Sequence, residues 1–367
     1  MHGRRAERDA RRRRARDDAR ATALQRGRGG RAIRRRRSRS GRRLRARWAA
    51  GTGRNARRGC LSRGHSPSTR RCPHQVTPSG LLIIDKPAGP TSHDVVGRVR
   101  RAAGTRRVGH AGTLDPLASG LLLVGVGRAT RLIEYLVGLD KVYETTVRLG
   151  RATTTYDAEG EVAAEKPVTV DEAAIRAALD AFRGPIHQRV PPFSAVKRDG
   201  QPLYKRARRG EAIDLPEREV TIHALDLLAY EPPLLTLRIA SSSGTYIRSL
   251  AHDLGQVLGC GGHVDTLRRT AIGRFTLADA VALDELTPAL FHAHLRPPEA
   301  AVGHLPRVMF NADEARLLGQ GQRLPAPDDA PPGDVAAFGP DERFIGVVTG
   351  EAGEWRARKM MSAVAEE

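Results

Sequence analysis

From residue 80 onward, apolar and polar positions follow the patterns of a mixed α/β protein. Short apolar runs and one alternating stretch predict strands at 81–84, 121–126, 143–149 and 235–240. Apolar positions at helical spacing predict helices that begin at Thr91 or Ser92, and that span 171–182 and 246–258. The strands show no regular βαβ period. We therefore expect an α/β (α+β) fold with a mixed, largely antiparallel central sheet flanked by helices.

The pattern also divides the chain into four parts. Residues 1–75 hold few large apolar side chains, so they cannot bury enough surface to offset their ordering entropy. Residues 76–287 are predicted to form the main domain, the prolines of 288–301 predict a linker, and 302–367 predict a small barrel-like module. Within that module the predicted elements are a capped helix at 311–318 and strands at 343–348 and 355–360.

The net charge of +21 belongs to the first part of the chain. Residues 1–75 hold 27 of the 62 Lys and Arg residues but only 4 of the 41 Asp and Glu residues, which leaves 35 basic and 37 acidic residues for the rest. Two interpretations of this tail compete: a disordered arm that binds RNA, or codons upstream of the true start. We favour the second, because Val76 stands where folded-type sequence begins and a GTG start codon otherwise encodes valine.

The composition argues against a membrane protein, a disulfide-bonded protein and a zinc-binding protein. The longest apolar runs, such as 121–124, are far shorter than the roughly 18 residues that span a bilayer, so we expect no membrane association. Cys60, Cys72 and Cys260 form no CxxC pair, which argues against a disulfide framework or a zinc knuckle. We expect a cytoplasmic protein without a metal site.

The stretch 109–120, GHAGTLDPLASG, surrounds one carboxylate with apolar residues. Its glycines free the backbone to turn, and Pro116 stiffens it. Leu114 and Leu117 would exclude water from Asp115, as a catalytic carboxylate requires. On its own, such a stretch is more often a Gly/Pro turn with a capping aspartate.

A second segment, 243–248, lies at a predicted strand-to-helix turn. Tyr246 and Arg248 are two residues apart, so both can face one cleft and offer a ring for stacking and a guanidinium for a carboxylate. The alternative is a helix start with a buried tyrosine and a solvated arginine. Tyr143, likewise, is either a half-buried strand residue or part of a substrate platform.

The segment 191–210 is the main basic patch of the body, and Asp199 is its single acid. Phe193 and Tyr204 lie between its cations, which suits RNA backbone contact with stacking; a solvated basic helix is the alternative. The cations are Lys197, Arg198, Lys205, Arg206, Arg208 and Arg209. A second patch precedes the Asp115 stretch and consists of Arg98, Arg100, Arg101, Arg106 and Arg107.

Several of these segments together resemble one family. The chain is similar to the TruB-type tRNA pseudouridine synthases from about Gly80 to Leu277. The module from 305 onward resembles, more weakly, the PUA-like RNA-binding domain of bacterial members. The segments that carry the resemblance are LLIIDKPAGPTSHDVV, GHAGTLDPLASGLLLVGVGRATRL, KVYETTVRLG, SAVKRDGQPLYKRARRGE, SSGTYIRSLAHDLG and HVDTLRRTAIGRF.

The resemblance implies an isomerase that converts uridine to pseudouridine at position 55, in the T loop of tRNA. The uracil is detached from N1, turned and rejoined through C5, with no metal or organic cofactor. The implied partner is the T stem-loop, and we expect a monomer. Two other hypotheses stay open: a non-catalytic RNA-binding or RNA-folding protein, and the same chemistry on another RNA.

The resemblance also assigns roles to site residues. It makes Asp115 the nucleophile, toward either the sugar C1′ or the base, and Arg248 the cation that keeps it ionised. It places Tyr246 against the uracil, as a candidate to move the C5 proton. The remaining implied contacts are Tyr143 stacked on the flipped base, Leu267 lining the pocket, His110 holding the loop, and Lys197, Lys205, Arg206 and Arg209 on the RNA backbone.

Overall fold

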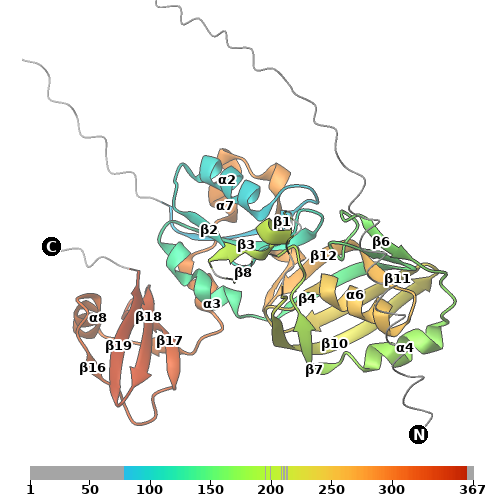
Figure 1. Cartoon of the computed structure of the whole chain (residues 1–367). Coiled ribbons are helices and arrows are strands. Elements are labelled where there is room, and N and C mark those ends of the chain that lie inside the picture. The colour runs from blue at the N-terminus through green and yellow to red at the C-terminus, as the bar shows by residue number, and fades with distance from the viewer. Residues whose placement is uncertain are drawn as a thin grey trace, which may run out of the picture. The chain divides into compact units, whose positions relative to one another are not determined.

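The computed structural model describes residues 78–361, except Ala195, Asp199, Arg208, Gly210, Ala212 and Ile213 (Figure 1). The predictions for the tail 1–75 therefore lie outside the described residues, as does that for Arg208. No helix of the described part combines the length and apolar character needed to cross a membrane.

A ten-stranded sheet forms the main domain. Its order is β14-β1-β3-β12-β4-β11-β10-β7, with β2 on β3 and β13 on β12. Neighbours are antiparallel except for the pairs β1–β14 and β3–β12, which confirms the expected mixed, largely antiparallel sheet. The strands are β1 (Gly80–Lys86), β2 (Val108–His110), β3 (Ser119–Val126), β4 (Lys141–Leu149), β7 (Gly184–Arg189), β10 (Glu217–Glu231), β11 (Leu234–Ser241), β12 (Gly262–Ile272), β13 (Phe275–Thr276) and β14 (Val281–Ala282).

The continuous apolar runs in β1 and β3 are explained by burial of both sheet faces. Leu82 and Leu122 pack on one face, in a cluster with helices α2 (Ser92–Ala103) and α7 (Pro288–His294), which lie side by side. Leu81 and Leu121 pack on the other face, against the segment of η1 (Gly127–Leu132) and α3 (Ile133–Val137). Thr91, one of the two predicted starts of this helix, is the N-cap of α2 and forms a capping box with Asp94.

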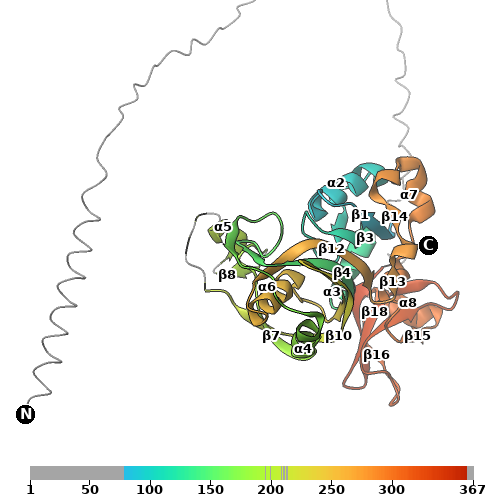
Figure 2. The ribbon, with the colours of Figure 1, turned by 90° about the vertical axis from the view of Figure 1, so that its right-hand side faces the viewer.

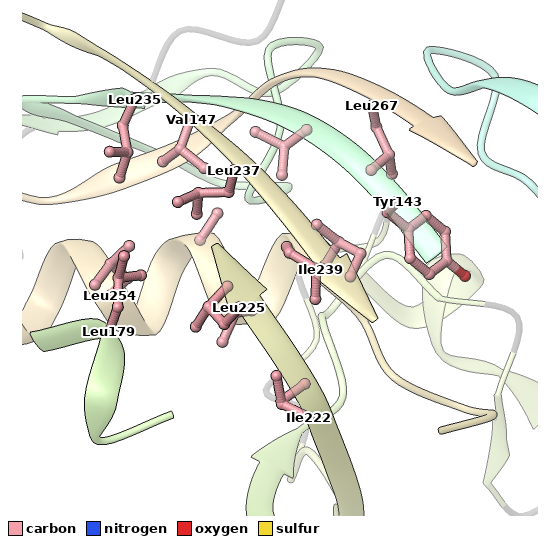
Figure 3. Close-up of a cluster of buried hydrophobic side chains, with 14 of the residues drawn as sticks. Tyr143, Val147, Leu179, Ile222, Leu225, Leu235, Leu237, Ile239, Leu254 and Leu267 are labelled. Atoms are coloured by element: carbon pink, nitrogen blue, oxygen red, sulfur yellow. The ribbon is translucent and has the colours of Figure 1, made fainter. Parts of the chain in front are cut away.

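The other half of the sheet has one main apolar cluster, covered by helices α4 (Glu172–Asp180) and α6 (Ile247–Val257) (Figure 3). Val147 of β4 and Leu237 of β11 alternate with polar positions and face Leu179 of α4 and Leu254 of α6. The alternation thus matches a sheet with one face packed on helices. The join between the two halves is the parallel pair β3–β12.

The stretch 288–301, predicted to be a linker, is largely helical. It contains α7, whose Phe291 is fully buried, and all but the last residue of the 3-10 helix η4 (Pro298–Val302), whose Ala301 is 1% exposed. The prolines do not prevent helix formation, because Pro288 and Pro298 are the first residues of their helices and Pro297 is an N-cap residue, and at these positions the missing N–H has no helical partner.

Two small sheets and one short helix connect these elements. They are β5 (Arg151–Thr153) with β6 (Val162–Glu165), β8 (Lys197–Arg198) with β9 (Gln201–Pro202), and α5 (Leu203–Ala207). The segment between β5 and β6 supplies Asp157, a carboxylate that pairs with Arg248 in the wall of the cavity described below.

The last part of the chain forms its own curled five-stranded sheet, order β15-β17-β18-β19-β16 (Figure 2). The predicted helix and strands of this module are present as α8, β18 and β19. The elements are β15 (Arg307–Met309), α8 (Ala312–Gly319), β16 (Leu324–Pro325), β17 (Gly333–Phe338), β18 (Phe344–Glu351) and β19 (Glu354–Met360).

The core of the helix-covered half provides a stability prediction. Leu237 is 1% exposed, so Leu237→Ala should lower the free energy of unfolding by about 2–5 kcal/mol through lost burial and a residual cavity. Leu228→Ala is the matched control, because Leu228 is 52% exposed and should change it by less than about 0.5 kcal/mol. Urea unfolding followed by circular dichroism measures both. Equal losses in the two variants would contradict the assignment of this core.

Candidate active site

A cavity of about 560 Å³ lies where the two halves of the sheet meet. Its walls come from the loop 111–118, the 193–194 segment, β10 and the turn 243–248. Five of the residues to which the resemblance assigns a role line it: Asp115, Tyr143, Tyr246, Arg248 and Leu267. Segments far apart in the chain therefore converge on one site.

The loop 111–118 between β2 and β3 is held by side chains from other elements. Ser92 Oγ accepts from the amide of Leu114 at 2.9 Å and donates to its carbonyl at 3.1 Å. Lys86 Nζ, fully buried, donates to the carbonyl of Pro116 at 3.4 Å. Both neighbours of Asp115 in the chain are therefore fixed, which pre-organises the carboxylate.

Two glycines of this loop region are structurally required. Gly112 and Gly120 have φ of +90° and +101°, which other residues rarely adopt. A Cβ at Gly120 would lie 2.2 Å from the carbonyl oxygen of Arg269 on β12. Arg269 is itself buried and donates to the carbonyl of Gly112 at 3.3 Å, so β12 packs directly against both ends of the loop.

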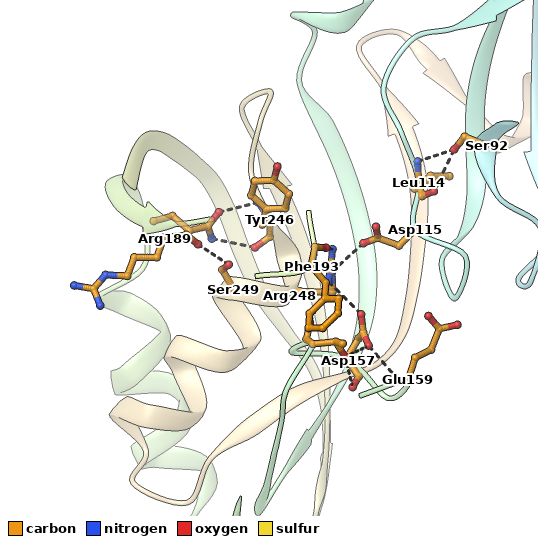
Figure 4. Close-up of polar contacts among 12 residues, drawn as sticks. Ser92, Leu114, Asp115, Asp157, Glu159, Arg189, Phe193, Tyr246, Arg248 and Ser249 are labelled. Carbon is orange, nitrogen blue, oxygen red and sulfur yellow. Dashed lines mark hydrogen bonds and ion pairs between the residues drawn. The ribbon is translucent and has the colours of Figure 1, made fainter. Parts of the chain in front are cut away.

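Arg248 forms the electrostatic centre of the site (Figure 4). Its Nε lies 2.9 Å from Oδ2 of Asp115, and its Nη1 lies 3.3 Å from Oδ2 of Asp157. It also donates to the carbonyls of Thr155 and Phe193, both at 3.0 Å. The residue is 4% exposed. The alternative of a solvated arginine at a helix start is therefore wrong.

The Asp115 carboxyl is affected by opposing influences. Burial raises its pKa above the usual range, the Arg248 guanidinium opposes that rise, and the negative charge of Asp157 adds to it. The net direction is upward. One side of the Asp115 side chain, 35% exposed, still opens to the cavity, so the carboxyl is accessible to a bound molecule.

Asp157 is a site residue that sequence reasoning missed. It is 3% exposed, and its second oxygen accepts from Thr155 Oγ1 at 2.5 Å and from the Glu159 amide at 3.1 Å. These contacts aim the carboxylate at Arg248. The local sequence TTTYDAEG looks like an ordinary polar turn, and only the fold brings it to an arginine of α6.

Tyr246 is fixed through its backbone. It is the N-cap residue of α6, and the side chain of Gln188 on β7 accepts from its amide at 2.7 Å and donates to its carbonyl at 3.0 Å. Gln188 is 1% exposed and was not singled out from the sequence. Burial raises the pKa of the Tyr246 phenol, so the hydroxyl keeps its proton at neutral pH.

Tyr143 and Leu267 form an apolar wall of the cavity. They lie on the paired strands β4 and β12 and are 8% and 7% exposed. A ring and a branched side chain at this place can contact the face of a planar group.

His110 is not among the residues that line the cavity. It lies on β2, half-buried, with its ring edge-on to that of His93 at 5.8 Å. Burial lowers its pKa, so the ring is neutral at neutral pH. A contact between His110 and RNA stays a prediction.

The basic segment carries less free charge than its composition indicates. Arg206 and Arg209 both pair with Glu211, at 3.0 and 2.5 Å, whereas Lys205 is exposed and has no acidic partner among the described residues. The side chain of Lys197 lies outside the part of the structure that is described. Lys205, Arg206 and Arg209 are not among the residues that line the cavity.

Comparison with known proteins identifies the class of the protein. A family model described as "TruB family pseudouridylate synthase (N terminal domain)" matches residues 100–247. A second, described as "tRNA pseudouridylate synthase B C-terminal domain", matches residues 248–314. The protein is a pseudouridine synthase.

Individual relatives narrow this class to a family. A protein of Thermobifida fusca (strain YX) named tRNA pseudouridine synthase B is 49% identical over 75% of this chain and 95% of its own length. A protein of the same name from Azoarcus sp. (strain BH72) is 44% identical over 80% of this chain and 98% of its own length. The chain belongs to the TruB family of pseudouridylate synthases.

Solved structures support the same fold. A chain in the structure of an H/ACA RNP bound to a substrate RNA containing 2′-deoxyuridine has a TM-score of 0.59 and 25% identity, over 77% of this chain and 84% of that chain. A chain in a Cbf5-Nop10-Gar1 complex has a TM-score of 0.59 and 27% identity, with the same coverage of both chains.

The shared guanidinium provides a prediction about Asp115. Asp157→Asn removes a negative charge that raises the Asp115 pKa, so the Asp115 carboxyl should titrate at lower pH in this variant. Carboxyl ¹³C NMR of the two proteins measures the change. Glu159→Gln, in the same turn but exposed, is the control and should leave the titration unchanged. An unchanged or higher Asp115 pKa in Asp157→Asn would contradict the coupling.

Proposed function

We propose that the protein isomerises uridine to pseudouridine at position 55, in the T loop of tRNA, and that Asp115 is the nucleophile. The observation that carries the proposal is the ion pair of Asp115 with buried Arg248 inside a cavity walled by Tyr143, Tyr246 and Leu267. The relatives' shared name, tRNA pseudouridine synthase B, supports the choice of tRNA as substrate.

The chemistry requires a base taken out of its stack. In a duplex or a folded loop the target atoms are covered, so the uridine must turn into a pocket before reaction. The ring of Tyr143 can stack on the everted uracil and return part of the cost. Leu114 and Leu267, both buried, would keep water away from a cleaved intermediate, which would otherwise be hydrolysed to an abasic site.

Asp115 would act as an ionised carboxylate. It attacks either the sugar C1′ or the base, the bond between C1′ and N1 breaks, the uracil turns, and a bond forms between C1′ and C5. If Asp115 had attacked C1′, its bond to C1′ breaks as the bond to C5 forms; if it had attacked the base, its bond to the base breaks afterwards. Arg248 would stabilise the ionised form at each stage in which the carboxylate is free, because burial alone favours the protonated form.

Tyr246 would stand beside C5 of the bound base. The proton on C5 must leave after the new bond forms, and N1 must gain a proton. A neutral phenol with a raised pKa is a suitable group to relay these protons, since it is protonated at the start.

The T stem-loop would lie across the cavity and reach the basic segment. Exposed Lys205 suits phosphate contact, and the curled sheet of residues 307–360 suits a PUA-like RNA-binding module. We further propose that the protein acts as a cytoplasmic monomer. His110 would help to hold the loop in its everted state.

Replacement of Asp115 tests the nucleophile. Asp115→Asn should lower the rate of pseudouridine formation on a T-stem-loop RNA by at least ~10³-fold with RNA affinity largely kept, because an amide cannot attack. Single-turnover assays with product mapping measure this. Asp226→Asn, an exposed carboxylate of β10, is the control. A variant that still isomerises would exclude Asp115 as nucleophile; wild-type product only in ribosomal RNA would exclude the tRNA substrate.

The pKa of Asp115 predicts the acid limb of the pH–rate profile. Since the pKa is raised and the ionised form reacts, the single-turnover rate should fall as pH decreases through a value above the ordinary aspartate pKa of about 3.9. The rate should recover as pH rises past that value. A limb at or below the ordinary value would contradict a buried carboxylate nucleophile.

The basic segment predicts a graded effect on RNA affinity. Lys205→Glu combined with Arg209→Glu should weaken binding of the T stem-loop and flatten its salt dependence, since fewer counterions are released. Lys205→Glu alone should account for most of the change, because Arg209 already pairs with Glu211. Filter binding at several salt concentrations measures the slopes. An unchanged slope in the double variant would favour a solvated basic helix.

A further inference from the structure

Among the described residues that line the cavity, four carry positive side chains: Lys141, Arg218, Arg248 and Arg269. Three of them are committed to other groups. Arg248 is shared by two carboxylates and two carbonyls, and Arg269 is 2% exposed and donates to carbonyls of the loop and of β3. Lys141, 5% exposed, donates to the carbonyls of Val137 and Leu139 at 2.6 and 2.5 Å.

Arg218 on β10 differs from these three. Its only hydrogen bond within the described residues runs from Nη1 to the carbonyl of Gly244, at 3.2 Å. Its Nε is buried and has no partner there, and no carboxylate of the described residues pairs with it. A partly buried guanidinium with unused donors can bind an acceptor of a bound molecule without losing an existing bond.

The position of Arg218 limits what that partner can be. Its guanidinium carbon lies 5.2 Å from the centre of the Tyr246 ring, at the cavity wall that would contact the everted base. Uracil is uncharged, so the anionic groups of a bound nucleotide are the phosphates on either side of its ribose. A guanidinium with adjacent free N–H groups matches phosphate oxygens well.

We propose that Arg218 binds a backbone phosphate next to the everted uridine, and that this contact sets the nucleotide against Tyr246. The inference rests on the proposed function, because it requires an RNA nucleotide in the cavity. Arg218 is then a substrate-binding residue. The other three lining cations are bound to carboxylates or carbonyls of the protein, so Arg218 is the one of the four with donors left for a phosphate.

A second account of the same geometry makes a different prediction. Arg218 could act only through the Tyr246 ring, by a cation–π contact that keeps the ring in place. In that case the loss of Arg218 would slow the reaction equally, whatever the charge of the neighbouring phosphates. The two accounts are separated by removing the phosphate charge as well as the side chain.

The experiment is a double-mutant cycle that combines Arg218→Ala with an RNA in which one backbone linkage is uncharged. In these T-stem-loop RNAs a methylphosphonate replaces the phosphate on the 5′ or the 3′ side of the target uridine. The sugar that precedes the linkage is 2′-O-methylated in every substrate, including the all-phosphate RNA. With wild type, the neutral linkage on one side should lower the single-turnover rate at subsaturating enzyme by about 10- to 100-fold. With all-phosphate RNA, Arg218→Ala should react more slowly than wild type by a similar factor. The neutral linkage should then slow this variant little further.

Two further variants keep the result interpretable. Arg218→Lys keeps the positive charge but not the adjacent N–H donors of the guanidinium, so it should retain part of the rate with all-phosphate RNA. Arg189→Ala is the matched control. Arg189 is an exposed arginine on the neighbouring strand β7 that pairs with Glu217 and does not line the cavity. This variant should therefore respond to the neutral linkage as wild type does. Thermal melts check that each variant is folded.

The outcomes are distinguishable. If, on both sides of the uridine, the neutral linkage costs Arg218→Ala as much as it costs wild type, Arg218 binds neither phosphate and the inference is overturned, while the proposed function stands. If wild type forms no pseudouridine in the all-phosphate T stem-loop or in intact tRNA, the proposed function and the inference both fail.

Discussion

A single buried guanidinium shared by two carboxylates is the constraint on which the site depends. Arg248 has almost no contact with solvent, so its charge must be balanced by groups of the protein. Asp157 provides a fixed counter-charge, held by its own turn, and Asp115 provides a second one that faces the cavity. Because one cation serves both, the protonation of Asp115 depends on Asp157, and the geometry of three distant segments is coupled through one side chain.

The scaffold supports this arrangement by holding backbone rather than reactive atoms. Ser92 and Lys86 bind carbonyl and amide groups on either side of Asp115, and Gln188 does the same for Tyr246. None of these bonds uses the functional atoms, so the carboxylate and the phenol stay available to a substrate. The parallel pair β3–β12 brings the two halves of the sheet together and makes Gly120 necessary, because no side chain fits between these strands at that position.

Burial acts on the ionisable groups of the cavity in a consistent way. It raises the pKa of both Asp115 and Tyr246, which keeps the phenol neutral and makes the carboxylate depend on its guanidinium partner. A carboxylate with little hydration is a stronger nucleophile, and a neutral phenol can exchange protons with a base. Arg218, in the wall of the same cavity, keeps a buried Nε donor that no described residue uses.

The sequence by itself determined the local elements and part of the site. Periodicity located β1, β3, β4, β11 and the helices α2, α4 and α6, because burial of one or both faces leaves a direct trace in the pattern. The sequence motifs also identified Asp115, Tyr246 and Arg248 as candidate site residues.

Other features of the site left no trace in the sequence, because each depends on a partner from another segment. They are the roles of Asp157 and Gln188 and the incomplete hydrogen bonding of Arg218. The prolines of 288–301 indicated a linker, but their positions in the first turns of two packed helices became visible only in three dimensions. Only the tertiary structure decided which charges meet, because pairing depends on distance in space and not on separation along the chain.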